Sequence, residues 1–154
     1  MNRLLLQFAV LLAGFVALPS LAAAPGHPDG NARLGIKGYD PVAYFTLQRA
    51  TPGDTQFEYQ WDEHVWRFAS AQHRELFKAD PVRYAPQFAN FCAVALARGE
   101  VREANPEYWL ISDGKLYLFG KSYGADLFRK ELERNVERAR HNRALLKAQE
   151  PGGR

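Results

Sequence analysis

The sequence predicts an α+β fold, in which two aromatic hairpins form a small antiparallel sheet, accompanied by short helices and a long C-terminal helix. The hairpins are indicated by four segments in which large side chains alternate with polar ones, at residues 57–61, 64–69, 107–112 and 115–119. The long helix is indicated by residues 123–149, which contain no proline and repeat apolar side chains at spacings of three and four.

The connections of both hairpins are short and polar. Asp62-Glu63 joins the first pair of strands, and Asp113-Gly114 joins the second pair. Asp-Gly between two alternating segments favours a type I′ turn, so the second hairpin is the clearer of the two predictions.

Two short helices are predicted from the same capping device. Asp40-Pro41 precedes residues 42–46, and Asp80-Pro81 begins a second Asp-Pro-Val-x-Tyr sequence. Asp is a good N-cap and Pro suits the first helical position. Ser70 is the expected N-cap of a third helix. This helix must end before Asp80, because the residue preceding a proline avoids helical geometry. The flanks of the two Asp-Pro motifs differ, which excludes a duplicated domain.

The apolar stripe of the C-terminal helix is narrow, and Arg143 interrupts it. The second half of this helix is basic, which is favourable to the helix dipole near its C-terminus. Contact with anionic lipid or an acidic partner is the alternative interpretation of that charge.

Aromatic residues make up 13% of the chain and should dominate the core, because each removes a large area from water. Truncation of Trp66 to Ala is predicted to cost about 3–5 kcal/mol. The predicted core comprises Phe57, Tyr59, Trp61, Trp66, Phe68, Phe77, Tyr84, Trp109 and Leu118.

The chain divides into four segments. Residues 1–23 have a positively charged N-terminal region, an apolar run and small residues before the expected cleavage site, which is typical of a secretory signal peptide. An uncleaved membrane anchor is the alternative, although the run is shorter than the roughly 20 residues that span a bilayer. Residues 24–33 are expected to be a flexible mature N-terminus, 34–148 the folded domain, and 149–154 a disordered end. The protein is therefore expected to be periplasmic or secreted, with no stable membrane span after cleavage.

The mild charge argues against a nucleic-acid partner. The whole chain carries +3, and Arg3 is the only charged residue of the predicted signal peptide, so +2 remains after cleavage. Cys92 is the single cysteine and has no internal disulfide partner. It is an inert core thiol, a thiol paired with another molecule, or a metal or redox ligand.

Candidate ligands for a metal are few. The sequence contains no phosphate loop, dinucleotide fingerprint or paired-cysteine zinc motif. A thiolate with one or two imidazoles suits copper(I) or zinc, so we take Cys92, His73, His64 and Asp40 as the candidate metal ligands, with copper or zinc as the candidate cofactor. A Cys-His catalytic pair is the enzymatic alternative, but nothing in the sequence orients the histidine.

Several motifs together resemble the exported bacterial YHS-domain family. The resemblance runs in order over roughly residues 36–140 and rests on the segments 37–45, 66–77, 80–87, 91–93 and 113–118. It implies a small α+β domain outside the cytoplasm. The wider superfamily is associated with metal handling, as a module of heavy-metal transport ATPases and near certain monooxygenases.

The chain departs from the metal-associated members of that superfamily. Their cysteines fall at positions that correspond to Ala43, Ala69 and His73, and of these only His73 can bind a metal. Relatives of the exported group often read Gly-Gly-Tyr-Cys-Ala, where this chain has Ala89 and Asn90 in place of the glycines.

Three functional hypotheses follow. The first is a periplasmic, non-enzymatic YHS module that binds a metal ion or a small ligand, with Cys92 and His73 as polar anchors. The second is a structural or protein-interaction module that uses the aromatic surface and the basic C-terminal helix. The third is an enzyme, which needs a pocket that joins Cys92 to a histidine.

Overall fold

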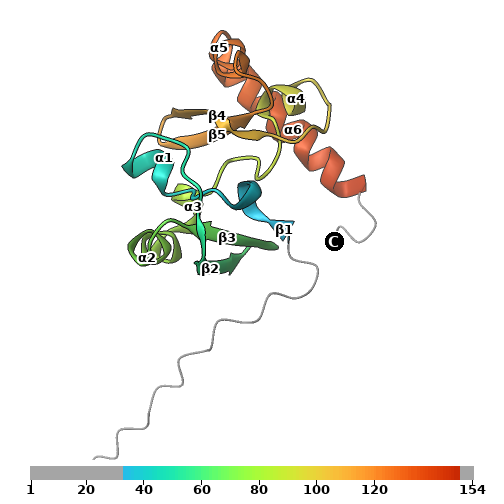
Figure 1. Cartoon of the computed structure of the whole chain (residues 1–154). Coiled ribbons are helices and arrows are strands. Elements are labelled where there is room, and N and C mark those ends of the chain that lie inside the picture. The colour runs from blue at the N-terminus through green and yellow to red at the C-terminus, as the bar shows by residue number, and fades with distance from the viewer. Residues whose placement is uncertain (1–32, 150–154) are drawn as a thin grey trace, which may run out of the picture.

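The computed structural model describes residues 33–149, and the predicted signal peptide lies outside them. The predicted mature N-terminus and disordered C-terminus also lie outside, except that Arg33 already belongs to the first strand and Gln149 ends the last helix. The fold is α+β, as predicted. Figure 1 shows one hairpin in the lower part of the molecule beside α2, and the other in the upper part beside α4, α5 and α6.

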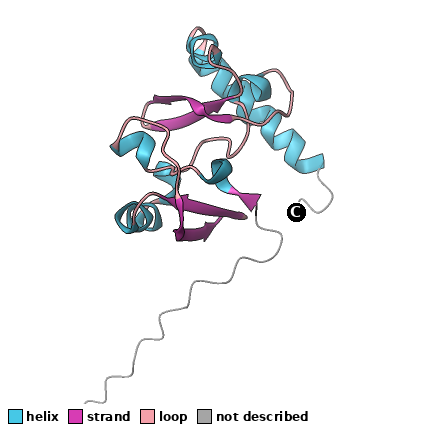
Figure 2. Ribbon diagram, viewed as in Figure 1, coloured by secondary structure: helices cyan, strands magenta, loops and turns pink. Residues whose placement is uncertain are grey.

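The first hairpin consists of β2 (Asp54–Trp61) and β3 (His64–Phe68), which pair antiparallel with Trp61 opposite His64. Asp62 and Glu63 between them have φ values of 48° and 62°, and two central residues with positive φ make the primed turn that matches strand twist. A two-residue strand, β1 (Arg33–Leu34), pairs in parallel with β3. Figure 2 shows these strands as one sheet, separate from the other hairpin.

The second hairpin consists of β4 (Asn105–Ser112) and β5 (Lys115–Phe119) around the predicted Asp113-Gly114 turn. It forms its own two-stranded sheet, so the prediction that both hairpins share one sheet is wrong. Its two faces are both buried: Leu116 and Leu118 belong to one hydrophobic cluster, and Tyr117 and Phe119 belong to another. The strand period of two therefore places this hairpin between two cores.

The first core contains all nine predicted core residues, either buried or packed against it. Trp66 is 1% exposed, and its ring centroid lies 5.3 Å from that of Phe77. Trp61 meets the same Phe77 ring edge-on, with centroids 5.8 Å apart. Aromatic contacts of this kind add to the stabilisation from buried area. The second core lies under the C-terminal helices.

Three short helices lie around the first hairpin. Helix α1 (Ala43–Thr46) precedes it, and α2 (Ala71–Ala79) and α3 (Pro81–Tyr84) follow it. The caps predicted at Ser70 and Asp80 are confirmed, whereas Val42 occupies the N-cap position of α1. Ser70 Oγ accepts from His73 N at 3.2 Å, and Asp80 Oδ1 accepts from Arg83 N at 3.2 Å. The contacts of Asp40 with the start of α1 are part of the site and are described below.

The entry segment of the domain, residues 33–38, contains little strand. After β1 the chain forms a 3-10 helix, η1 (Gly35–Gly38), in which Ile36 and Lys37 have φ values of 38° and 55°. The Asn90 side chain holds this turn, because its Oδ1 accepts from Ile36 N at 2.5 Å and its Nδ2 donates to Leu34 O at 3.0 Å. Such contacts between residues distant in sequence are not visible in a local pattern.

The predicted continuous helix over residues 123–149 is two helices, α5 (Gly124–Arg129) and α6 (Leu132–Gln149), so that prediction is corrected. The break has no proline. Asn135 Nδ2 donates to Phe128 O at 3.0 Å, which satisfies a carbonyl at the end of α5 that the broken helix leaves without its usual donor. The fully buried Phe128 ring fixes α5 in the second core, and α6 continues in the direction that lets Ala139 enter the same core.

Candidate functional site

Cys92 lies immediately before α4 (Ala93–Ala97), at the surface of the second core. Its backbone N donates to Arg102 O at 2.8 Å, and Ala104 N donates to Asn90 O at 2.8 Å. These two bonds fix the segment that carries the thiol against residues 102–104. The thiol is buried in the sense that Cys92 is only 7% exposed. Cys92 is thus buried, as expected for a core thiol, but it also borders a cavity.

That cavity, called the Cys92 pocket from here on, has a volume of about 570 Å³. This lies within the range of roughly 300–1,000 Å³ that is usual for small-molecule sites. Its walls come from α4, the loop that follows α4, the loop after β5, and α5. The lining residues are Cys92, Val94, Ala95, Arg98, Glu100, Arg102, Glu103, Gly120, Lys121, Tyr123, Gly124 and Leu127.

The charge of the Cys92 pocket is mixed, with an excess of cations. Arg98, Arg102 and Lys121 line it together with two carboxylates. Arg102 Nε pairs with Glu100 Oε2 at 2.7 Å, and the carboxylate of Glu103 is 3.4 Å from Lys37 Nζ, outside the pocket. Both acids therefore already have a cation, whereas the salt bridges among the described residues include neither Arg98 nor Lys121.

Gly120 keeps the space beside the thiol open. A Cβ on this residue would lie 3.8 Å from Cys92 Sγ and 3.2 Å from Glu103 O. An alanine here would therefore narrow the pocket at the sulfur with only a small adjustment of the backbone. The sequence contained no signal for this role of Gly120.

Asp40 and His73 meet in a different part of the molecule. Asp40 is completely buried, and its Oδ1 accepts from Val42 N and Ala43 N at 2.8 and 3.3 Å. Its Oδ2 accepts from Ala69 N at 2.9 Å and from His73 Nδ1 at 2.5 Å. A buried carboxylate costs free energy unless it is fully hydrogen-bonded, and four donors meet that requirement. Asp40 therefore joins α1, the end of β3 and α2.

The other ring nitrogen of His73 lies 3.2 Å from Thr46 Oγ1, which completes a carboxylate–imidazole–hydroxyl series. The same hydroxyl donates to Val42 O at 3.1 Å. A hydroxyl whose proton is held by a helical carbonyl is not arranged as a nucleophile, since nucleophilic attack needs the proton passed to the base. The series is best explained as a structural connection.

His64 lies in a third place, beside the turn of the first hairpin. Its Nδ1 is 2.6 Å from Asp62 O, and its ring centroid is 5.7 Å from that of Trp66. It lines a separate cavity that contains neither Cys92 nor His73.

The four predicted metal ligands are thus distributed over three regions, and only Asp40 and His73 are brought together. Within residues 33–149 no group of three or more His, Cys, Asp and Glu side chains could hold a metal ion. The lone pairs of Asp40 are also occupied by four N–H donors, so a metal would have to displace them. The residues present do not fit the copper or zinc centre that a thiolate with one or two imidazoles suggested.

The cations of the Cys92 pocket were missed in the sequence analysis. The only local signal was the charged turn between residues 98 and 103, which follows the cysteine closely. Lys121 and Tyr123 reach the pocket from the end of β5, and their proximity to Cys92 depends on the tertiary fold.

Comparison with known proteins gives no relative: no family model, no curated protein and no solved structure matches this chain. Among the helices that the structure describes, none combines the length and apolar character needed to cross a bilayer.

Proposed function

We propose that this protein is an exported, non-enzymatic YHS module that binds a small anionic molecule in the Cys92 pocket. The observation that carries this proposal is the lining of the pocket. Its two carboxylates are already paired, one of them with Arg102, and the thiol lies beside two further cations, Arg98 and Lys121. The order of the YHS-like motifs and the signal-peptide pattern of residues 1–23 support the family and the export.

The anion class follows from the donors. Arg98 and Lys121 contribute charged N–H groups to the lining of this half-open pocket, and such groups form the stronger hydrogen bonds with carboxylate or phosphate oxygens. The apolar wall formed by Val94, Ala95 and Leu127 suits a short hydrocarbon body. A carboxylate on a small apolar skeleton therefore fits both parts of the lining.

Titration of the protein without residues 1–23 tests the proposal. Acetate, butyrate, succinate and inorganic phosphate are added, and binding is followed by calorimetry and by amide NMR shifts around Gly120. We expect at least one of these anions to bind with a Kd below about 1 mM. The Arg98→Gln/Lys121→Gln variant should weaken that binding at least tenfold, which corresponds to about 1.4 kcal/mol.

Arg49→Gln/Lys130→Gln is the matched control, since it removes the same charge from residues that line none of the described pockets. Gly120→Ala should also weaken binding by narrowing the space at the sulfur. Equal affinities in wild type, Arg98→Gln/Lys121→Gln and the control, or no binding by any anion of the series, would refute the proposal.

The metal form of the same proposal has its own test. Copper(I) or zinc binding tighter than about micromolar that is lost in Cys92→Ser would support a metal module in place of an anion module. The distribution of Cys92, His73, His64 and Asp40 over three regions argues against this result.

The protein-interaction alternative has one observation in its favour. The outer face of α6 exposes Arg134, Arg138 and Arg140, with Leu145 at 50% exposure. Truncation is a poor test, because Ala139 is buried and Asn142 Nδ2 donates to Leu96 O at 2.8 Å. Arg138→Glu with Leu145→Ser keeps these contacts, and an unchanged set of co-purified partners would count against this alternative.

A further inference from the structure

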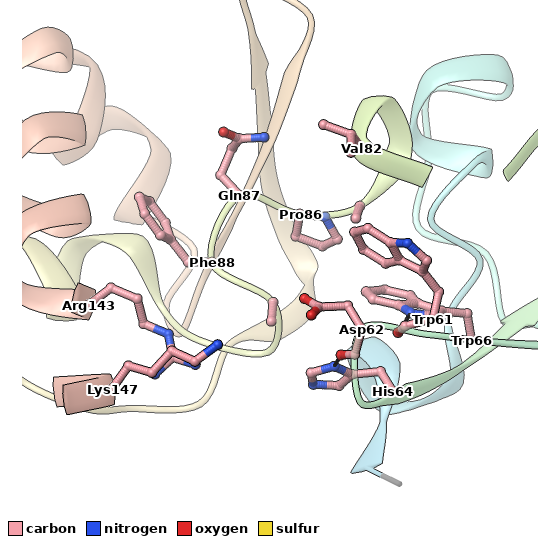
Figure 3. Close-up of a pocket in the computed structure, with 12 residues that line it drawn as sticks. Trp61, Asp62, His64, Trp66, Val82, Pro86, Gln87, Phe88, Arg143 and Lys147 are labelled. Carbon is pink, nitrogen blue, oxygen red and sulfur yellow. Dashed lines mark hydrogen bonds between the residues drawn. The ribbon is translucent and has the colours of Figure 1, made fainter. Parts of the chain in front are cut away.

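A second cavity lies between the turn of the first hairpin and the C-terminal half of α6. Its volume is about 280 Å³, and it shares no lining residue with the Cys92 pocket. We call it the hairpin–α6 pocket. Figure 3 shows Trp61, Asp62, His64 and Trp66 along one side, with Arg143 and Lys147 reaching toward them from the helix opposite.

The hairpin side of this pocket presents hydrogen-bond acceptors. Asp62 contributes a carboxylate, and no salt bridge within the described part of the chain involves it. His64 Nδ1 must donate to Asp62 O, 2.6 Å away, because a carbonyl oxygen only accepts. In the neutral ring this fixes the tautomer, and Nε2 is then an acceptor. This side therefore suits a ligand group that donates hydrogen bonds and carries positive charge.

The helix side presents donors. Lys147 is exposed and lines the pocket one turn after Arg143. The guanidinium of Arg143 lies 4.7 Å from the ring centroid of Phe91, which holds it near the pocket by a cation–π contact. This explains how an arginine is accommodated within the apolar stripe of α6. The helix side therefore suits a carboxylate.

The floor between the two sides is apolar and rigid. Trp66 is fully buried, and its Nε1 donates to Trp61 O at 3.0 Å. Trp61 is held edge-on against Phe77, so its indole cannot move freely. Pro86 and Phe88 complete the apolar surface. A site whose walls are fixed before binding loses less free energy to ordering when a ligand enters.

From this arrangement we propose that the hairpin–α6 pocket binds a small zwitterion, with an ammonium group at Asp62 and His64 and a carboxylate at Lys147 and Arg143. The hydrocarbon body between the two charges lies on Trp61, whose aromatic face also attracts a cation. A simple anion is repelled by Asp62, and a simple cation is repelled by Lys147 and Arg143. Only a molecule with both charges matches both sides.

The separation between ammonium and carboxylate that fits the pocket can be found with a series of ligands. Glycine, β-alanine, 4-aminobutyrate and 6-aminohexanoate place the same two groups at increasing separation. Each is titrated into the protein without residues 1–23, and binding is followed by tryptophan fluorescence, since Trp61 and Trp66 line the pocket. We expect one member of the series to bind with a Kd below about 1 mM, and its N-acetyl and amide derivatives to bind at least tenfold more weakly.

Matched variants locate the binding. Asp62→Asn keeps a residue that tolerates the φ of 48°, and Lys147→Gln removes the charge while keeping a polar side chain that is one atom shorter. Each substitution should weaken binding of the zwitterion at least fivefold. Glu63→Gln in the same turn and Arg138→Gln on the same helix do not line the pocket and should change its affinity less than twofold.

The proposal is overturned if no member of the series binds, or if Asp62→Asn and Lys147→Gln behave like their controls. Binding of the N-acetyl derivative as tightly as of the free amine would show a simple anion site and would equally reject a zwitterion. Because the Cys92 pocket shares no residue with this one, failure here leaves the anion proposal for that pocket unaffected, and the reverse also holds.

Discussion

Asp40 and Asp80 begin two copies of the sequence Asp-Pro-Val-x-Tyr, and each precedes a helix of four residues. The first copy is buried throughout, with Asp40 and Val42 both at 0% exposure. The second copy is mostly exposed, with Val82 at 71% exposure and Asp80 exposed, and only its Tyr84 is buried. The same five-residue pattern therefore begins a four-residue helix in two very different surroundings, at Ala43 in the first copy and at Pro81 in the second.

The difference arises from the number of segments that each aspartate joins. Asp80 accepts one hydrogen bond from its own helix, at Arg83 N. Asp40 accepts four, and two of them come from Ala69 and His73, which lie far along the chain. A cap becomes a tertiary connection when other elements supply donors to the oxygen that the helix does not use. Phe45, which directly follows the first copy, meets Tyr84 of the second copy edge-on, with ring centroids 5.4 Å apart.

The largest expected contrast is between Asp40→Ala and Asp80→Ala. Loss of Asp40 leaves four buried donors without an acceptor, and we expect the free energy of unfolding to fall by about 3–5 kcal/mol. Loss of Asp80 removes one exposed cap and should cost about 1 kcal/mol. Urea unfolding at neutral pH measures both values. Losses within 1 kcal/mol of each other would show that the tertiary donors add little to the cap.

The valines of the two motifs should differ less, but in the same direction. Val42→Ala leaves a cavity in the first core and is expected to cost about 1–3 kcal/mol. Val82→Ala removes an exposed side chain and should change the free energy of unfolding by less than about 0.5 kcal/mol. Both substitutions delete the same atoms, so a similar cost at the two positions would contradict the burial that distinguishes them.

The smallest contrast concerns the tyrosines and depends on pH. Tyr44 is fully buried and its hydroxyl donates to Pro106 O at 2.9 Å, so Tyr44→Phe should cost about 1 kcal/mol. Burial, assisted by the charge of Glu107, raises the pKa of Tyr44 above its ordinary value of 10.0. A raised pKa stabilises the fold fully below pH 10, and this contribution is lost as the pH rises above 10.

Measuring the free energy of unfolding from pH 7 to 11 tests the predicted direction of this pH dependence. Wild type should lose stability above pH 10 more steeply than Tyr44→Phe, so the difference between them should shrink there. Tyr84→Phe is the control, because the Tyr84 hydroxyl has no hydrogen bond to a described residue. A constant difference between wild type and Tyr44→Phe across this range would show that Tyr44 does not contribute to the pH dependence.

Sequence patterns predicted the local structure well where the residues of one segment determine its conformation. Alternating aromatics predicted both hairpins, and Asp113-Gly114 predicted the second turn. The helix caps at Ser70 and Asp80 were predicted from residue type and position alone. The site was predicted less well, because grouping Cys92 with His73 assumed a proximity that no local pattern encodes.

The segment before Cys92 depends on contacts that no local pattern reveals. Ala89 has a φ of 49°, in the left-handed region that favours glycine. An alanine adopts this conformation only at a local cost in free energy. Asn90 joins residues 34 and 36 to the Cys92 segment. No local signal in the sequence predicted this tertiary contact.

By itself the sequence determined the α+β class, the two hairpins, the capped helices and the aromatic core, because periodicity and capping act within a few residues. The tertiary structure decided that the hairpins form separate sheets and that the C-terminal helix breaks near Lys130. It also decided that Asp40 accepts a hydrogen bond from His73, whereas Cys92 lines a pocket with Arg98 and Lys121. These outcomes depend on which donors, charges and apolar faces meet across the fold, and chain order alone does not specify those distances.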